Sequence, residues 1–280
     1  MIPYYIQLLP YSGHKKGKST FDKNGVIMSK IRYNKHYNYH ATAIASYAII
    51  NLPSEQAYEN INWLKNNHEK GAIYHDFDIV SYDNVRAPWI GSLAQSLSIS
   101  ALCLAYKHDK DKDNLLTAHK FMGALEKHCI QRNLLGTWFC EYPNIYSILN
   151  GHIYSMFCLQ DIIKYTTSPE TKQRAQSLWK ETEHTVLNNL YRYNLGNWSR
   201  YDLHTLVPAK EFYHKVHISQ LQYLNFMGGS PLYDKLITDW IKGLNKIHHY
   251  KFKAMWMHMK RHGLIESMKR LKQTLEWKYL

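Results

Sequence analysis

The spacing of apolar residues constrains this chain most, because from about Tyr39 onward it follows the period of an α-helix. Apolar residues over 41–50 predict one helix, and Ser54 followed by Glu55 is typical of the N-cap of a second helix that ends near Asn67. The same pattern predicts helices over 89–107, 113–131, 146–165, 171–191, 213–226, 231–244 and from 250 onward. The chain is therefore predicted to be mainly helical.

The predicted helices form antiparallel pairs, with aromatic, polar loops over 73–87 and 194–212 between them, and a short aromatic segment over 137–144 is expected to be a strand or a turn. Such pairs can curl into an α/α toroid whose loops meet at one mouth, or they can stack as a bundle or solenoid. Periodicity does not separate these architectures, and no repeat of fixed length is evident.

The first 38 residues do not show the helical spacing of apolar residues. Turn signals stand at Ser12-Gly13 and Asn24-Gly25, and residues 25–29 after the second turn have the pattern of a short strand. We expect a single domain with an irregular segment and a β-hairpin over 1–38, a helical body over 39–245, and a basic C-terminal helix or tail over 246–280.

The charge of the chain suggests an anionic ligand, and its aromatic content suggests a polar one such as a sugar. The net charge is +13, which predicts a polyanionic partner such as nucleic acid, an anionic membrane or an acidic polysaccharide. There are 23 tyrosines and 8 tryptophans against 8 phenylalanines, and rings with polar tips suit a sugar cleft. An AT-rich genome would produce the same bias, so composition alone leaves the ligand open.

Targeting signals and disulfide patterns are not evident. The N-terminus lacks a basic, apolar leader, and no stretch approaches the length of a membrane span. Four cysteines occur without a C-x-x-C pair or zinc-site spacing. These observations predict a soluble, cytoplasmic protein with free thiols.

Two segments combine groups that could bind or react with a sugar. In the first, Trp89 could stack on a sugar ring and Gln95 could bind a hydroxyl, although a core tryptophan with a buried glutamine fits equally well. In the second, Glu141-Tyr142 sets two acid–base groups side by side. Asn150-Gly151 follows within a predicted helix, where glycine costs about 1 kcal/mol and suggests a close backbone approach or helix contact.

Two later segments carry cations and histidines. Arg200, Tyr201 and His204 occur together in one loop. His214 and His217 lie three residues apart, on one helix face, but no third ligand or H-E-x-x-H motif accompanies them. We therefore predict histidines that are structural or bind substrate, and no metal.

The order of these segments resembles the D-glucuronyl C5-epimerase family. The resemblance runs from about residue 20 to 245. It includes Asp22 to Val26, Tyr39-His40 with Ile44-Ala45, Pro88-Trp89 with Leu93 to Gln95, Glu141-Tyr142-Pro143 with Leu149-Asn150-Gly151 and Tyr154-Ser155, Tyr201-Asp202-Leu203, and Tyr213-His214 with His217, Ile218, Gln220 and Leu221. The sequence departs from the family pattern at His204, where arginine is usual, at Glu211-Phe212, which replace Trp-Asp, and at Ser96, which replaces glycine.

The resemblance implies a fold and a chemistry. The fold would be an incomplete α/α toroid, and the reaction would be inversion of uronic-acid residues at C5 without cofactor or metal. The catalytic residues carried over are Glu141, Tyr142, Tyr201 and Tyr213. The substrate-binding set that we predict is Arg200, His204, His214, Trp89, Gln95, Asn150 and His217. Of these, Arg200 is favoured to bind the uronate carboxylate in place of the missing arginine.

Other classes of function stay open. A polysaccharide lyase removes the same C5 proton, and a basic, non-catalytic protein would bind an anionic glycan through charge and stacking alone. The predicted partner is an acidic polysaccharide that contains uronic acid, rather than nucleic acid. The oligomeric state is left open, with a homodimer as one possibility.

Overall fold

The computed structural model describes residues 18–31, 36–79, 85–246, 250 and 256–257. Near the N-terminus, β1 (Ser19–Phe21), β2 (Ile27–Lys30) and β3 (Tyr37–Asn38) form an antiparallel sheet in that order. Gly25 turns the chain between β1 and β2 with a φ of 82°, a conformation that favours glycine. The β-hairpin predicted from Asn24-Gly25 is thus confirmed, whereas the predicted turn at Ser12-Gly13 and most of the basic tail lie outside the described residues.

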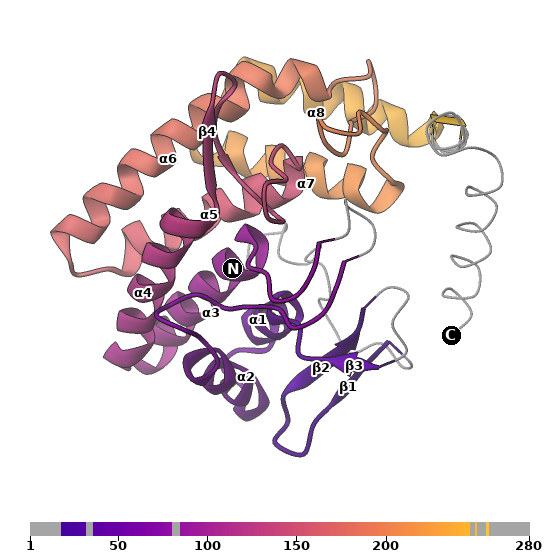
Figure 1. Ribbon diagram of the computed structural model, residues 1–280. Helices are drawn as coiled ribbons and strands as arrows, with labels where there is room; N and C mark the ends of the chain where they lie inside the picture. Colours follow the sequence, from indigo (N-terminus) through magenta and orange to yellow (C-terminus); the bar gives the residue numbers. More distant parts are fainter. Residues whose placement is uncertain (1–17, 32–35, 80–84, 247–249, 251–255, 258–280) are drawn as a thin grey trace.

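The rest of the described chain is built from helix pairs. The pairs are α1 (Ala41–Asn51) with α2 (Glu55–Asn66), α3 (Ser92–Asp109) with α4 (Lys112–His128), α5 (Leu149–Tyr165) with α6 (Pro169–Asn189), and α7 (Glu211–Met227) with α8 (Pro231–Gly243). Short 3-10 turns, Leu190–Tyr193 and Leu244–Lys246, follow α6 and α8. Figure 1 shows the pairs following one another along an arc, from α1 and α2 at the lower edge to α7 and α8 at the top.

The first helix of each pair lies inside the arc and the second lies outside. Inner helices pack against one another in the order α1, α3, α5 and α7. Nine of the 11 residues of α1 are buried, against six of 21 in α6, because an inner helix has neighbours on several sides. The arrangement is the incomplete α/α toroid that the sequence predicted.

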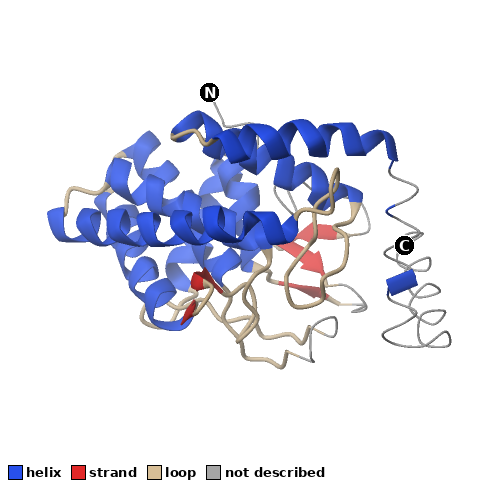
Figure 2. Ribbon diagram, turned by 90° about the horizontal axis from the view of Figure 1, so that it is seen from above, coloured by secondary structure: helices blue, strands red, loops and turns tan. Residues whose placement is uncertain are grey.

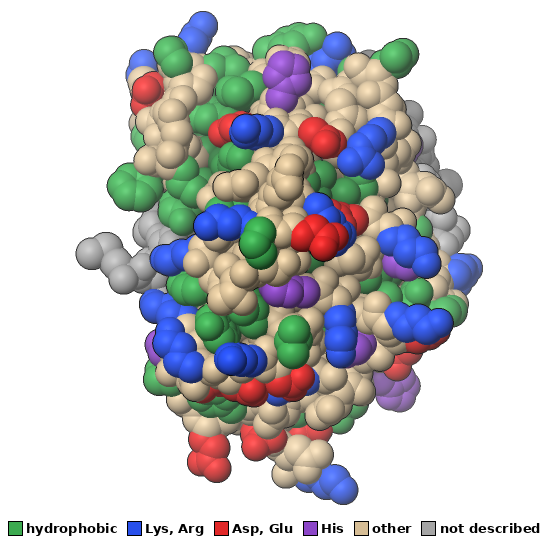
Figure 3. Space-filling model, turned by 90° about the vertical axis from the view of Figure 1, so that its left-hand side faces the viewer, with side chains coloured by type: hydrophobic (Ala, Val, Ile, Leu, Met, Phe, Trp, Pro, Cys, Tyr) green, Lys and Arg blue, Asp and Glu red, His purple; other side chains and the backbone are tan. Residues whose placement is uncertain are grey.

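Some charged side chains on the outer helices form ion pairs with one another. Arg174 on α6 pairs with Glu126 on α4, for example. Figure 3 shows that basic side chains on this face are interspersed with acidic ones rather than gathered into one patch.

Because the helices alternate in direction, the inner helices run parallel and begin at the same end of the toroid. The long loops before α3, α5 and α7 therefore meet at that end, and Figure 2 shows loop segments gathered on one side of the helices. These loops contain most of the residues singled out from the sequence. The fold thus brings together segments that are far apart along the chain.

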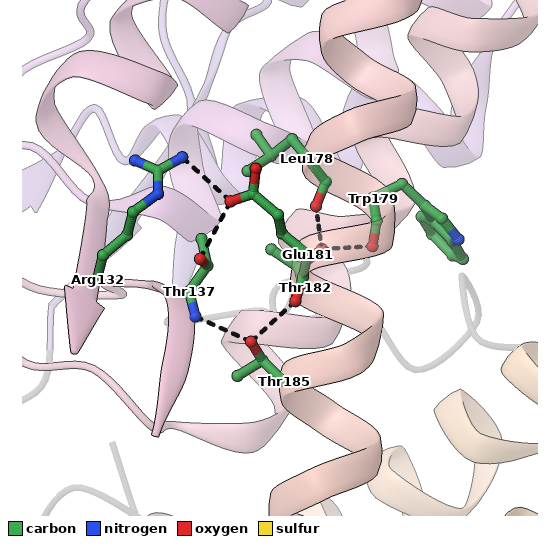
Figure 4. Close-up of polar contacts among 7 residues, drawn as sticks. All are labelled: Arg132, Thr137, Leu178, Trp179, Glu181, Thr182 and Thr185. Carbon is green, nitrogen blue, oxygen red and sulfur yellow. Dashed lines mark hydrogen bonds and ion pairs between the residues drawn. The ribbon is translucent and has the colours of Figure 1, made fainter. Parts of the chain in front are cut away.

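A small hairpin interrupts the helical pattern before α5. The predicted helix over 113–131 ends at His128, and β4 (Ile130–Asn133) pairs with β5 (Gly136–Phe139). Figure 4 shows how α6 holds β5: the Thr137 N–H donates to Thr185 Oγ1 at 2.9 Å, and the Thr137 hydroxyl donates to Glu181 at 3.1 Å. The strand is fixed in place two residues before Glu141.

Candidate active site

Two of the loops at the mouth, those before α5 and α7, are tied to the start of the preceding inner helix. The Ser92 N–H at the start of α3 donates to the Cys140 carbonyl at 2.8 Å, and the Leu149 N–H at the start of α5 donates to the Tyr201 carbonyl at 3.2 Å. The first N–H groups of a helix have no partner inside it, so each loop satisfies a group that would otherwise be unpaired. As a result, Glu141-Tyr142 and Tyr201-Asp202 lie at consecutive helix starts.

Glu141 occupies a position that two glycines make possible. A methyl group added at Gly91 would overlap the Glu141 carbonyl oxygen, and one added at Gly151 would overlap the Glu141 carboxylate. The glycine inside α5 therefore serves the close approach that Asn150-Gly151 suggested, and the group that approaches is a carboxylate. Glu141 is itself 8% exposed.

The surroundings of Glu141 hold its pKa near neutrality. Burial raises the pKa to about 7, a hydrogen bond from Tyr142 opposes the rise, and the nearby charge of Asp202 adds to it. Such a carboxyl group exchanges protons readily at neutral pH, which is the property required of a general acid or base.

Trp89 forms the wall beside Tyr142. The two rings are 5.4 Å apart, and the Trp89 indole N–H donates to the Phe77 carbonyl at 2.7 Å. The indole nitrogen is thus already used, and the side chain is only 5% exposed because it packs with Ile31 and Phe77, so Trp89 is chiefly a core residue.

Tyr201 and Tyr213 form a second aromatic pair. Their ring centroids are 4.7 Å apart, although Tyr201 comes from the loop before α7 and Tyr213 from the first turn of that helix. Tyr154 of α5 lies close by, since burial and then the Tyr213 hydroxyl raise the Tyr154 pKa. Residues from three segments therefore meet here.

Asp202 connects the two groups of residues. It is fully buried, and its carboxylate accepts hydrogen bonds from the backbone and hydroxyl of Thr205. It also pairs with Ile148 in a short antiparallel bridge at the start of α5. Because the charge of Asp202 helps to raise the pKa of Glu141, the loop that carries Tyr201 lies near the Glu141-Tyr142 pair.

Two buried amides beside Glu141 retain free acceptors. Gln220 of α7 donates to the Asn150 carbonyl at 2.9 Å. Among the described residues, Gln220 Oε1, Asn150 Oδ1 and Glu141 Oε2 have no hydrogen-bond partner. An unpaired buried acceptor is costly, and it calls for an explanation such as a bound water, a ligand or a catalytic role. Asn150 was in the predicted set; Gln220 was noted only for its place in the family pattern, and its unpaired oxygen could not be read from sequence.

A cleft of about 640 Å³ opens next to this site. Of the predicted residues, Trp89 and His204 line it, together with Arg86, Asn144, Tyr146 and Leu203 among others. Arg86 was not predicted, because a single arginine in a loop carries no sequence signal. The volume suits a small sugar unit.

His214 and His217 lie behind the site rather than in the cleft. Both are fully buried, and the Ser199 hydroxyl lies 2.8 Å from Nδ1 of each ring. His214 also stacks on Trp198, with 3.7 Å between the rings. Burial lowers the His214 pKa to about 4 and the His217 pKa well below its usual value, so both rings are neutral at pH 7. Their contacts hold the loop that carries Tyr201.

The side chains of two other predicted residues form hydrogen bonds to backbone groups. Gln95 is fully buried, accepts from the Ile73 N–H at 3.2 Å, and donates to the carbonyls of Gly71 and Phe121. Arg200 donates from Nη1 to the Leu206 carbonyl at 2.8 Å within its own loop. Gln95 thus anchors the start of the loop before α3, and Arg200 braces the loop before α7. The described residues contain no cluster of side chains suited to a metal ion.

Comparison with known proteins assigns the chain to a family. The family model described as the D-glucuronyl C5-epimerase C-terminus matches residues 66–242, more than half of the chain. The chain belongs to this family. The match spans Glu141, Tyr142, Tyr201 and Tyr213.

Two relatives share sequence with this chain over much of its length. The chain is 26% identical over 213 residues to D-glucuronyl C5-epimerase of Caenorhabditis elegans, covering 67% of this chain and 35% of that protein. It is 29% identical over 177 residues to an uncharacterised protein of Methanocaldococcus jannaschii, covering 59% and 56%.

The solved structures share only the fold. Endo-β-1,4-glucanase CMCax of Acetobacter xylinum superposes with a TM-score of 0.56 at 11% identity, covering 88% of this chain and 79% of that one. An α-mannanase of Bacteroides thetaiotaomicron gives 0.54 at 10% identity, covering 86% and 72%. Within the described part of this family member, no helix is both long and apolar enough to cross a membrane.

Proposed function

We propose that this protein inverts uronic-acid residues in an acidic polysaccharide by removing the proton at sugar C5 and returning one to the opposite face. One observation carries the proposal: a buried carboxyl group with a pKa of about 7 is hydrogen-bonded to Tyr142 and lies within electrostatic reach of the loop that carries Tyr201. Membership of the C5-epimerase family supports the same reading.

The chemistry explains why these residue types suit the task. The C5 proton is weakly acidic because it lies next to a carboxylate, and its removal places a second negative charge on that group. The site must stabilise this charge with fixed donors or positive potential. The parallel inner helices direct the positive ends of their dipoles toward the mouth, which favours an anion there.

The geometry suggests a division of roles. On one side, Glu141 accepts the hydrogen bond from Tyr142, so it can take the phenolic proton as Tyr142 takes the proton from C5. On the other side, Tyr201 or Tyr213 supplies a phenolic proton to the planar intermediate, since a phenol is normally protonated at neutral pH. In the reverse reaction the two sides exchange roles.

Proton exchange in deuterated water tests the proposal. Incubated with a non-sulfated glucuronic-acid polymer, the protein should introduce deuterium at C5 and produce the inverted sugar, both seen by NMR. Tyr142→Phe should abolish exchange while polymer binding stays within about twofold. If the wild-type protein binds the polymer without any exchange, it is a binding protein and the proposal fails.

A lyase would give a different product. Lyases also remove the C5 proton, but they then expel the C4 oxygen and leave a double bond that absorbs ultraviolet light. If the polymer is cleaved and ultraviolet absorbance rises, the function of this site is elimination rather than epimerisation.

We further propose that the protein acts in the cytoplasm. The cysteines at 103, 129, 140 and 158 are free and buried, as suits a reducing compartment. A homodimer stays a proposal, which sedimentation of the purified protein would test.

A further inference from the structure

The cleft beside Tyr142 carries one permanent positive charge. Arg86 lines it together with Trp89 and His204, and its side chain is 70% exposed. Among the cleft-lining residues that the structure describes, none is acidic and no other is a lysine or arginine. An anionic group that enters the cleft would therefore meet Arg86 with no carboxylate in the wall, and it would share the guanidinium with Asp78, which lies outside the wall.

Asp78 orients Arg86 from outside the cleft wall. Arg86 Nη1 lies 2.5 Å from Asp78 Oδ2, while Asp78 Oδ1 accepts the Ala87 N–H at 2.9 Å. One carboxylate thus fixes both the guanidinium and the backbone that leads to Trp89. Asp78 is the one partner of Arg86 among the described residues, and several of the five guanidinium donors are left for a ligand.

The cleft lies next to the proposed reacting groups but does not contain them. Trp89, in its wall, contacts Tyr142, and His204 follows Asp202 by two residues. Glu141, Tyr142, Tyr201 and Tyr213 are not among the residues that line it. When a sugar unit of a polymer lies at the reacting groups, a nearby unit of the same chain would occupy this space.

We propose that the cleft is a subsite for a sugar unit beside the reacting one, and that Arg86 binds the carboxylate of that unit through its guanidinium fork. The inference rests on the proposed function. It narrows the substrate to polymers in which a second acidic sugar lies close to the one that is inverted. The carboxylate bound by Arg86 is thus a different one from the carboxylate of the reacting uronate, for which the sequence favoured Arg200.

The test uses variants of Arg86 with a matched control. Arg86→Ala removes the charge, and Arg86→Lys keeps the charge but loses the fork. Arg174→Ala is the control, because Arg174 is also a partly exposed arginine paired with one carboxylate, on the outer helices. Two readouts are needed: deuterium exchange at C5 as kcat and KM, and binding of a glucuronic-acid polymer and of its carboxyl-reduced counterpart.

Arg86→Ala should raise KM and weaken binding of the acidic polymer by roughly tenfold to a hundredfold, the range for a hydrogen bond to a charged group. Its kcat should change less than about twofold, because Arg86 does not touch the reacting sugar. Arg86→Lys should fall between Arg86→Ala and wild type, Arg174→Ala should match wild type, and binding of the carboxyl-reduced polymer should not respond to Arg86.

Several outcomes would overturn the inference. If Arg86→Ala exchanges and binds like wild type, Arg86 has no role in substrate binding. If kcat falls while KM holds, Arg86 contacts the reacting sugar and the cleft is not a neighbouring subsite. If wild type shows no exchange but its polymer binding depends on Arg86, the epimerase proposal fails and the binding site stands.

Discussion

At the scale of single residues, the site depends on where Glu141 is forced to sit. Gly91 and Gly151 leave just enough room for its backbone and carboxylate, and burial then raises its pKa to about 7. The sequence predicted Glu141 as a site residue and Gly151 as a point of close approach. It could not predict that the group approaching Gly151 is the Glu141 carboxylate, because these residues are ten positions apart and meet only after the hairpin and α5 have packed.

The pH dependence of turnover should follow Glu141. If Glu141 receives a proton from Tyr142, it must start ionised, so kcat should rise with pH around an apparent pKa near 7. Glu141→Gln should abolish exchange at every pH. A pH profile of exchange measures both, and a kcat that falls through neutral pH would contradict this role.

Glu141→Gln should also change stability in a pH-dependent way. The folded pKa, about 7, lies above the unfolded value of 4.5, so the folded protein binds more protons between these pH values and loses stability as pH rises through them. Above pH 7 the buried charge costs about 3 kcal/mol. In urea denaturation, the free energy of unfolding of Glu141→Gln relative to wild type should be clearly higher at pH 8 than at pH 5. An equal difference at the two pH values would exclude this linkage.

Replacing Gly151 should separate activity from stability. In Gly151→Ala the new methyl group displaces the Glu141 carboxylate, so turnover should fall at least tenfold. Stability should change little, because the better helix propensity of alanine, about 1 kcal/mol, offsets the strain. Gly123→Ala on α4 is the control, since a methyl group there meets no atom within 4 Å. It should be more stable and fully active; equal loss of turnover in both variants would refute the argument.

At the scale of secondary structure, local sequence signals predicted which segments are helical more accurately than they predicted where each helix begins and ends. Ser54 caps α2 as predicted, accepting the Ala57 N–H. The helix predicted from Trp89 starts at Ser92, and the one predicted from Tyr146 starts at Leu149, because aromatic residues in the loops continue the apolar pattern. The β4–β5 turn lacked a recognisable signal because Leu134-Leu135 occupy its tip.

Thr185 should matter more than its neighbour Thr182, although both are buried on α6. Thr185→Val leaves the buried Thr137 N–H without a partner, which costs about 1–3 kcal/mol, and it loosens the strand before Glu141. Thr182 donates only within its own helix, to the carbonyls of Leu178 and Trp179, so Thr182→Val should cost less. Thermal unfolding and exchange rates of the two variants check this, and equal losses would show that Thr137 finds another partner.

At the scale of the whole molecule, charge acts over a longer distance than any single contact. The net charge of +13 should attract a polyanion before contact is made, and salt screens this attraction. KM for the polymer should therefore rise with salt between about 50 and 300 mM, while kcat, which depends on enclosed groups, should stay constant. Exchange kinetics at several salt concentrations measure both, and a KM that does not respond to salt would rule out steering.

The hydrogen bonds between helix starts and following loops also bear on how the chain folds. The Ser92 N–H pairs with the Cys140 carbonyl, and the Leu149 N–H pairs with the Tyr201 carbonyl, so the starts of α3 and α5 are each completed by a segment synthesised later. During synthesis, the N–H groups at the start of the most recently made inner helix would be exposed to water until the following loop had been synthesised and had docked. Docking would therefore proceed from the N-terminus toward the C-terminus. Amide exchange during refolding should therefore protect Leu149 only after the loop that contains Tyr201 has docked.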